Sequence, residues 1–342
     1  MNRNLCCHTP QSSKGPAARS VLFNLGDHLN QIEDPEALMT KFQTIDVPHL
    51  GGSKIGCRTA TEYDPQLPTL VMINSFTTSS ELYRRQFADV NLTSKVNLLA
   101  LEPYGHGATR TAGEQFTYWD SAIANIQVLD RLGIKSAFVL GTSQGGWIAM
   151  RMALLAPSKI DGVIPLGTSM DYESAASREL GCWDAPAFCD PWIADLAMEV
   201  ESAWAPSDQY CNDLIDPAFG IDIDQETRAF WTSRLKENYK GDDGRSRLRM
   251  CTINLRDRDG LRGRLDGVVS PVLWLHGTED VVYSVSHAEK EAKLFPCAKS
   301  VSFKAIEGGH HFLSATNPEE VNQETLAFIQ QHWSQEARQA AE

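Results

Sequence analysis

Short apolar runs alternate with longer amphipathic stretches along the chain from about residue 40. Five runs have the length of buried strands, at residues 70–73, 96–101, 137–140, 162–166 and 272–275. Residues 120–132 place apolar side chains at helical spacing, with Asp120 as the expected N-cap, and residues 145–155 predict a second helix. This alternation predicts an α/β fold with a mostly parallel central sheet flanked by helices.

The alternation stops between about residue 171 and residue 265, where helical fragments occur without a clear strand run. Four of the eight tryptophans also lie there: Trp183, Trp192, Trp204 and Trp231. The regular pattern resumes at residue 267, which favours an insertion into one sheet over two sequential domains. We expect a flexible N-terminal tail (1–20), a first part of the core (21–170), a helical cap inserted between strands (171–265) and a second part of the core (266–342).

Composition narrows the class of protein. The 342 residues are 42% hydrophobic and 22% charged, which is ordinary for a globular protein and excludes a disordered chain, a collagen-like repeat or a coiled coil. The formal net charge is −13 at pH 7, so the protein would repel phosphate backbones and anionic membranes. We therefore expect neither a nucleic acid nor a membrane as a partner.

Sequence features near the N-terminus and the cysteine spacing bear on location. The first ten residues contain no apolar run typical of a signal peptide, and no stretch of the chain approaches the roughly 18 apolar residues of a membrane span. The eight cysteines lack the spacing of metal ligands, so free thiols in a reducing compartment are expected. These features favour a cytoplasmic protein.

A candidate nucleophile follows the predicted strand at 137–140. Residues 141–145 read Gly-Thr-Ser-Gln-Gly and lead directly into a predicted helix, which is the strand–turn–helix context of a nucleophile elbow. Such a turn strains the backbone of Ser143, and glycines two residues away on each side avoid steric clashes. The structural alternative is a glycine-rich turn with an uninvolved serine. A similar turn at residues 167–171 lacks the second glycine and is rejected as an elbow.

A serine nucleophile needs a base, and the base needs an acid that orients it. Asp280 lies just beyond the predicted strand at 272–275, and His310 and His311 follow near the C-terminus. The order of serine, acid and histidine along the chain is the order found in elbow proteins.

Together, these motifs resemble those of the α/β-hydrolase fold superfamily with an inserted helical cap. The resemblance covers roughly residues 40–335 and rests on four segments, residues 141–146, 102–107, 276–280 and 309–320. Because the elbow carries serine, the chain is similar to Ser-His-Asp hydrolases and not to epoxide hydrolases or haloalkane dehalogenases, whose elbow carries aspartate. More loosely, it resembles hydrolases of fungal polyketide pathways, which implies a role in secondary metabolism.

The resemblance implies roles for the acid and the base. Asp280 occupies the usual acid loop of the family, and Asp171 occupies the family's alternative acid position. The structural reading of Asp280 is an N-cap for a helix that starts near Ser284. His311 is the expected base, because an aromatic residue follows it directly and Pro318 comes seven residues later. His310 is then a structural neighbour.

The resemblance also implies an oxyanion hole made of two backbone N–H groups. One belongs to Gln144, the residue after the nucleophile, and the other to Phe76 in the loop after the strand at 70–73. This loop begins Asn74-Ser75 where the family usually has His-Gly. Because Ser75 lacks the conformational freedom of glycine, a residue adjacent to Phe76 is an alternative donor.

Three further features have both a functional and a structural interpretation. His106 lies in a Gly-His-Gly loop that matches a structural loop of the family, which favours a packing role. The tryptophans of the predicted cap either line an apolar substrate cavity or pack on the sheet. Seven arginines gather at the end of the cap and either anchor an anionic group, such as a carboxylate or coenzyme A phosphates, or pair with nearby acids such as Asp257 and Asp259. These arginines are Arg245, Arg247, Arg249, Arg256, Arg258, Arg262 and Arg264.

The predicted function is that of a serine hydrolase without a metal or an organic cofactor. Ser143, His311 and Asp280 would cleave an ester, lactone or thioester of a small apolar or polyketide-like acyl substrate through an acyl-enzyme. The alternatives are a C–C bond hydrolase or an acyltransferase with the same triad, and a non-catalytic ligand-binding protein of the same fold. The sequence does not indicate an oligomeric state.

Overall fold

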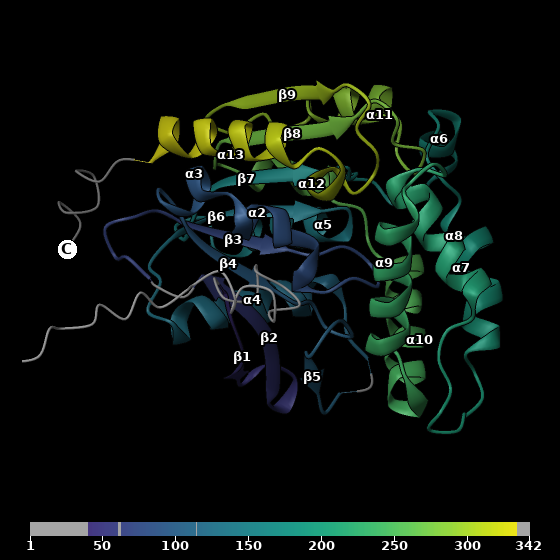
Figure 1. Ribbon diagram of the computed structural model, residues 1–342. Coiled ribbons are helices and arrows are strands. Elements are labelled where there is room, and N and C mark those ends of the chain that lie inside the picture. Colours follow the sequence, from purple (N-terminus) through teal and green to yellow (C-terminus); the bar gives the residue numbers. More distant parts are fainter. Residues whose placement is uncertain (1–39, 61–62, 114, 334–342) are drawn as a thin grey trace, which may run out of the picture. The chain divides into compact units, whose positions relative to one another are not determined.

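The computed structural model describes residues 40–60, 63–113 and 115–333, which form one mixed β-sheet with helices on both faces (Figure 1). The predicted tail at 1–20 and the start of the predicted core at 21–39 lie outside the described residues. The strands are β1 (Thr40–Val47), β2 (Ser53–Ala60), β3 (Thr69–Ile73), β4 (Asn97–Leu101), β5 (Arg110–Thr111), β6 (Ala137–Thr142), β7 (Ile160–Leu166), β8 (Val272–Gly277) and β9 (Val301–Ile306).

The sheet is mostly parallel, as the sequence predicts. Its strand order is β1-β2-β4-β3-β6-β7-β8-β9, and the short β5 pairs with β2. From β4 to β9 every neighbouring pair is parallel, whereas β2 is antiparallel to β1 and to β4. The carboxyl ends of the parallel strands therefore meet at one edge of the sheet.

Two layers of helices cover the sheet. One hydrophobic cluster joins the sheet to α4 (Tyr118–Arg131), α5 (Gln144–Leu155) and α11 (Val285–Glu291), and the other joins it to α2 (Arg84–Ala88), α3 (Val90–Thr93) and α13 (Pro318–His332). Successive strand residues point to opposite faces, so Val71 belongs to the first cluster and Leu70 to the second. Because both faces are covered, strands such as β3 and β4 are fully buried and read as continuous apolar runs.

The strands missing from the prediction are β1, β2, β5 and β9, which lie at or next to the two ends of the sheet. Most residues of β1 and of β9 are exposed or half-buried, so neither strand contains a continuous apolar run. The helix predicted from residue 120 begins earlier, at Tyr118. Its N-cap is Thr117, whose side chain accepts the Asp120 N–H while the Asp120 carboxylate accepts the Thr117 N–H. Asp120 is thus the third residue of a capping box, and the prediction of Asp120 as N-cap is wrong.

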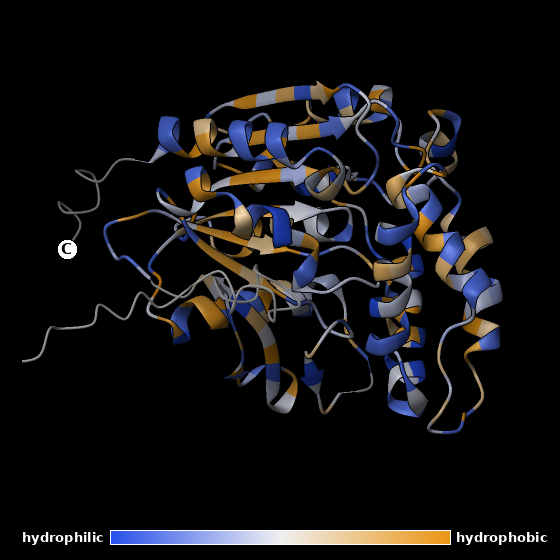
Figure 2. Ribbon diagram, viewed as in Figure 1, coloured by the Kyte–Doolittle hydropathy of each residue, from blue (hydrophilic) through white to orange (hydrophobic). Residues whose placement is uncertain are grey.

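Between β7 and β8 the described chain forms helices and no strand. We call these the cap helices: α6 (Ala175–Glu179), α7 (Ala185–Asp195), α8 (Asp208–Phe219), α9 (Gln225–Asn238) and α10 (Gly241–Asp257). They lie beyond the carboxyl edge of the sheet in Figure 1. In Figure 2 several cap helices alternate hydrophilic and hydrophobic residues along their length, as expected of helices packed on one side only.

Backbone hydrogen bonds fasten the cap helices to the sheet edge. The Leu261 N–H donates to the Met170 carbonyl (2.7 Å), so the two ends of the inserted segment meet. The Trp183 N–H donates to the Val282 carbonyl, and the Phe312 N–H donates to the Ala218 carbonyl, each at 2.9 Å. The loops that follow β8 and β9 are thereby joined to the cap.

Short helices complete the chain: the 3-10 helices η2 (His49–Gly51), η3 (Ser80–Tyr83) and η4 (Arg262–Gly267), and α12 (Leu313–Thr316). Within the described ranges, no helix has both the length and the apolar character that crossing a bilayer requires. The described cysteines, Cys57, Cys182, Cys189, Cys211, Cys251 and Cys297, form no disulfide with one another.

Candidate active site

The candidate nucleophile occupies a strained turn between β6 and α5. Ser143 has φ 53° and ψ −118°, a backbone conformation that non-glycine residues rarely adopt. A Cβ atom at Gly145 would lie 2.0 Å from the Ile73 carbonyl oxygen, and one at Gly141 would lie 2.1 Å from the Gly145 backbone. Both glycines are therefore required for the strand, the turn and the helix to approach each other this closely.

Ser143, His311 and Asp280 form one hydrogen-bonded chain although they are far apart in the sequence. The Ser143 Oγ lies 2.9 Å from the His311 Nε2, and the His311 Nδ1 lies 2.9 Å from an Asp280 carboxylate oxygen. A carboxylate only accepts hydrogen bonds, so the proton of a neutral His311 is on Nδ1 and Nε2 accepts from the Ser143 hydroxyl. All three residues are buried. The arrangement can move a proton from the serine to the imidazole.

The environment of Asp280 keeps its carboxylate ionised. Its Oδ1 accepts the N–H groups of Val282 (2.8 Å) and Tyr283 (3.0 Å), and its Oδ2 faces His311. Burial acts to raise the pKa of Asp280, but the charge and hydrogen bond of His311, together with nearby His276, hold its pKa below the usual value. The same carboxylate does not cap a helix, because the N-cap of α11 is Ser284.

The alternative acid and base lie elsewhere. The Asp171 carboxylate pairs with Arg262 (3.1 Å) and accepts the Ser174 hydroxyl (3.0 Å). The His310 N–H donates to Thr316 (3.4 Å), and its side chain lines a separate hollow with Phe219. In the described structure neither residue is hydrogen-bonded to Ser143, His311 or Asp280.

Gln144, the first candidate oxyanion donor, is held in place by its side chain. Its amide nitrogen donates to the His106 Nε2 (2.9 Å), and its amide oxygen accepts the Tyr118 hydroxyl (3.2 Å). His106 donates from Nδ1 to the Tyr104 carbonyl (2.9 Å), and burial lowers the pKa of His106 to about 4, so Nε2 is free to accept. Because Gln144 is the first residue of α5, its backbone N–H has no partner within the helix.

The loop that carries the second candidate donor, Phe76, is stabilised without the usual His-Gly pair. The Asn74 amide donates to the carbonyls of Ser75 (3.1 Å) and Thr78 (2.9 Å) and so closes the turn. The residue with positive φ is Thr77 (60°), whereas Ser75 is not in that region. A serine at position 75 therefore imposes no backbone strain of the kind that would require glycine.

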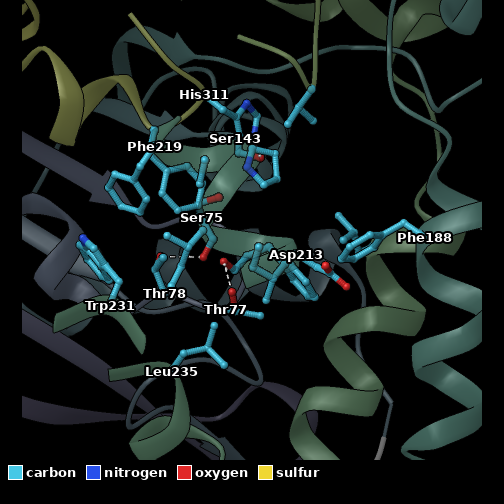
Figure 3. Close-up of a pocket in the computed structure, with 18 of the residues that line it drawn as sticks. Ser75, Thr77, Thr78, Ser143, Phe188, Asp213, Phe219, Trp231, Leu235 and His311 are labelled. Carbon is cyan, nitrogen blue, oxygen red and sulfur yellow. Dashed lines mark hydrogen bonds between the residues drawn. The ribbon is translucent and has the colours of Figure 1, made fainter. Parts of the chain in front are cut away.

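A cavity of about 160 Å³ opens beside Ser143 and His311 (Figure 3). Apolar side chains of the cap helices and of the loops at the sheet edge make up most of its wall. They include Phe76, Trp183, Phe188, Leu214, Ile215, Phe219, Trp231, Leu235, Leu255, Val281, Val282 and Phe312. Two of the four cap tryptophans thus line the cavity, whereas Trp192 and Trp204 line a different hollow beside Tyr210.

The arginine cluster at the end of the cap does not reach this cavity, since none of the seven is among its described lining residues. Six pair with carboxylates: Arg245 with Asp242, Arg247 with Asp243, Arg256 with Asp190 and Asp257, Arg258 with Glu173, Arg262 with Asp171 and Glu291, and Arg264 with Asp259. Arg249 donates to the Ile193 carbonyl. The geometry therefore matches the paired alternative and gives no anchor for an anionic substrate.

The side chain of Glu173 is buried beside the site, and the sequence alone assigns it no role. Glu173 pairs with Arg258 and also accepts the Tyr283 hydroxyl (2.9 Å) and the Trp183 indole N–H (2.8 Å). Glu173 precedes the cap helices, Arg258 follows them, and Tyr283 lies three residues after Asp280. A separation of 85 residues leaves no local pattern from which this pair could be predicted.

The described residues contain no group of three His, Cys, Asp or Glu side chains that could hold a metal ion.

Two curated proteins illustrate the sequence similarity. The dihydrolipoyllysine-residue acetyltransferase component of the acetoin cleaving system of Pseudomonas putida is 25% identical over 268 residues, which are 77% of this chain and 64% of that relative. The chain thus spans less than two thirds of that protein. The pimeloyl-(acyl-carrier protein) methyl ester esterase of Nitrosomonas europaea is 24% identical over 69% of this chain and 86% of its own length.

Solved structures share the fold. The enol-lactonase from Burkholderia xenovorans superimposes with a TM-score of 0.67 at 17% identity, covering 84% of this chain and 100% of that one. An esterase from Thermogutta terrifontis gives 0.68 at 14% identity, covering 85% and 100%. A family model for the alpha/beta hydrolase fold matches residues 68–318, which is most of the chain. The sheet order, the elbow and this match agree, and the chain belongs to the alpha/beta hydrolase fold family.

Proposed function

We propose that this alpha/beta hydrolase cleaves a carboxylic ester or lactone of a small apolar acyl substrate, with Ser143 as nucleophile. The observation that carries the proposal is the hydrogen-bonded chain from Ser143 through His311 to Asp280, at 2.9 Å for each link. A strained serine, an imidazole and a buried carboxylate in this order are the arrangement that activates a hydroxyl group for acyl transfer.

The mechanism follows from the atoms in this chain. The Ser143 Oγ attacks the substrate carbonyl carbon while His311 Nε2 accepts its proton, and Asp280 stabilises the imidazolium. The backbone N–H groups of Gln144 and Phe76 bind the oxyanion of the tetrahedral intermediate. His311 then returns the proton to the leaving oxygen, so the substrate C–O bond breaks and the acyl-enzyme forms. In the second half, His311 accepts a proton from water as the water oxygen attacks the acyl carbon, and it returns this proton to the Ser143 Oγ as the acid is released. No metal or organic cofactor takes part in these steps.

The relatives and the cavity favour an oxygen ester over a thioester. One relative is named as a methyl ester esterase, and two structural neighbours are named as an enol-lactonase and an esterase. A coenzyme A thioester would need cationic groups for its phosphates, and six of the seven arginines at the end of the cap pair with carboxylates instead. The polyketide-like substrate, the role in secondary metabolism and the cytoplasmic location stay predictions.

A fluorophosphonate probe tests the proposal because it reacts only with an activated serine. We expect the purified protein to be labelled and the Ser143→Ala variant to remain unlabelled. The matched control is Ser169→Ala, which removes the serine of the similar turn after β7 and should leave labelling intact. Labelling that survives in Ser143→Ala, or a folded wild-type protein that is never labelled, would contradict the proposal and favour a non-catalytic binding protein.

A further inference from the structure

On one side the cavity beside Ser143 ends against a pair of stacked aromatic rings. Phe219, the last residue of α8, and Trp231 of α9 both line the cavity. The centroids of the two rings lie 5.4 Å apart, and their planes differ by 28°. Figure 3 shows both residues on the side of the cavity opposite Phe188. We call these two rings the aromatic partition.

A second hollow, of about 360 Å³, lies behind the aromatic partition, because the same two rings line it as well. Among the described residues no other lines both spaces. We call this second space the outer hollow. Its wall includes polar and charged side chains such as Arg84, Arg85, Asp224 and His310, whereas the wall of the cavity is mostly apolar. The aromatic partition therefore stands between an apolar space beside the candidate nucleophile and a polar space away from it.

Packing on several sides holds the aromatic partition in place. The Phe219 ring meets the Phe312 ring nearly at a right angle, with 5.2 Å between the centroids. The Ala218 carbonyl accepts the Phe312 N–H (2.9 Å), which fixes the backbone beside Phe219. The chain then turns at Gly220 with φ 90°, and a Cβ atom there would lie 2.7 Å from the His310 imidazole. Both rings of the partition are buried, so they leave little open passage between the two spaces.

We propose that the aromatic partition keeps the apolar chain of the substrate out of the outer hollow and so sets the longest chain that the enzyme accepts. This inference rests on the proposed function, and it specifies the substrate as a short-chain ester or lactone. Each methylene group that enters the apolar cavity adds favourable transfer free energy until the chain reaches the rings. A further methylene group must displace packed side chains, which is unfavourable.

Two series of esters locate this limit. p-Nitrophenyl alkanoates of four to twelve carbons vary the acyl chain, and alkyl acetates with chains of the same lengths vary the alcohol. In at least one series we expect kcat/KM of the wild type to rise with length and then to fall at least about tenfold, at the length that reaches the rings. The series that shows the fall identifies the arm of the substrate that faces the partition. A kcat/KM that does not fall in either series would overturn the proposal.

Removing a ring should move the limit to longer chains. Trp231→Ala connects the cavity with the outer hollow and should raise kcat/KM at least about tenfold for the first chain length that the wild type rejects. A gain of this kind cannot arise from misfolding. Phe219→Leu is a milder change and should move the limit in the same direction. Ile221→Ala is the matched control, because Ile221 is 80% exposed and lines neither space. A limit that neither variant moves, or that Ile221→Ala moves equally, would overturn the proposal.

Refilling the outer hollow provides the converse test. Thr227 lies four residues before Trp231 on the same side of α9 and lines the outer hollow but not the cavity. Added to Trp231→Ala, Thr227→Trp places an indole ring in the space that the longer chain would enter. We expect the limit to return towards that of the wild type. An undiminished gain in the double variant would show that the chain does not enter the outer hollow, and would overturn the partition as its barrier.

Methyl ketones separate this proposal from the proposed function, because they fill the cavity without a bond that can be hydrolysed. Calorimetric titration with 2-alkanones of five to eleven carbons should give a Kd that increases beyond a limiting length in the wild type and beyond a greater length in Trp231→Ala. If the ketones show this shift and no ester is cleaved, the partition stands and the serine mechanism fails. If esters are cleaved and neither kcat/KM nor Kd responds to Trp231→Ala, the mechanism stands and the partition fails.

Discussion

The two sides of the cavity differ in how their polar atoms are satisfied. On the sheet side, which we call the sheet wall, Ser143, His311 and Asp280 already bind one another. Four residues of α9 also line the cavity, and we call them the α9 wall: Trp231, Arg234, Leu235 and Asn238. In this wall the Arg234 Nε and the Asn238 Nδ2 are buried and have no hydrogen-bond partner in the described structure. The proposed reacting groups are thus organised before any substrate arrives, as electrostatic preorganisation requires.

The two walls also differ in what supports them. The sheet wall stands on loops at the ends of β6, β8 and β9, and the side chains of β6 and β8 are buried throughout. The α9 wall belongs to a single helix, in which only Trp231 and Leu235 are buried. Substitutions should therefore affect turnover most at the sheet wall and substrate preference at the α9 wall.

The largest effect is expected for Ser143→Ala. Loss of the nucleophile should lower kcat on a p-nitrophenyl ester by about 10⁵- to 10⁶-fold, since removal of a catalytic serine in comparable hydrolases has effects of this order. Steady-state and single-turnover rates on a short-chain ester provide the measurement. Turnover within tenfold of the wild type would show that the sheet wall is not the reactive side of the cavity.

The next largest effect is expected for Asp280→Asn. The amide cannot hold His311 in the required tautomer, so kcat should fall by about 10⁴-fold with little change in KM. Asp171→Asn is the matched control and should keep kcat within about threefold, because Asp171 pairs with Arg262 and not with His311. If the control lost more activity than Asp280→Asn, the acid would have to be reassigned to Asp171.

A smaller effect, on stability, tests the buried ion pair that joins the two ends of the cap segment. Glu173→Leu leaves Arg258 buried without its partner and should lower the free energy of unfolding by about 3–5 kcal/mol in urea titrations. Asp190→Ala breaks a solvent-exposed pair with Arg256 and should cost less than about 1 kcal/mol. The double variant Glu173→Leu with Arg258→Leu should recover part of the loss. Equal costs for the buried and the exposed pair would contradict this account.

The smallest effect concerns pH. Burial holds the pKa of His106 at about 4, below its ordinary value of 6.5, so above pH 6.5 the residue is neutral in both the folded and the unfolded states. As the pH falls from 6.5 towards 4, only the unfolded state takes up this proton, and stability should decrease by at most about 1.4 kcal/mol per pH unit. His106→Gln should reduce the dependence of the free energy of unfolding on pH by up to about 1.4 kcal/mol per pH unit, as measured by urea titrations between pH 7 and 4.5. An unchanged slope would mean that His106 is protonated in the folded protein.

Residues whose role depends on local chain geometry could be predicted from the sequence, and those whose role depends on distant partners could not. The buried strands are continuous apolar runs, and the elbow requires two glycines, so both leave local patterns. The capping box at Thr117 was misassigned by three residues because Thr117 and Asp120 are both good caps.

The remaining features depend on contacts between distant segments. The His106–Gln144 bond and the Glu173–Arg258 pair join residues that are 38 and 85 positions apart. The arginine cluster illustrates the same point, since its charge is visible in the sequence but its carboxylate partners are not.

The meeting of Met170 and Leu261 at the base of the cap has a consequence for the design of new variants. Because these two residues are hydrogen-bonded to each other, the 90 residues between them leave the core and return to it at one place, while β7 pairs directly with β8. The entropic cost of closing a loop grows only slowly with its length, so a longer or shorter segment between these positions changes this cost only slightly. A cap of another size, grafted at this junction, would present a new recognition surface if it also reproduced the hydrogen bonds of Trp183 and Ala218 to the loops that carry Asp280 and His311.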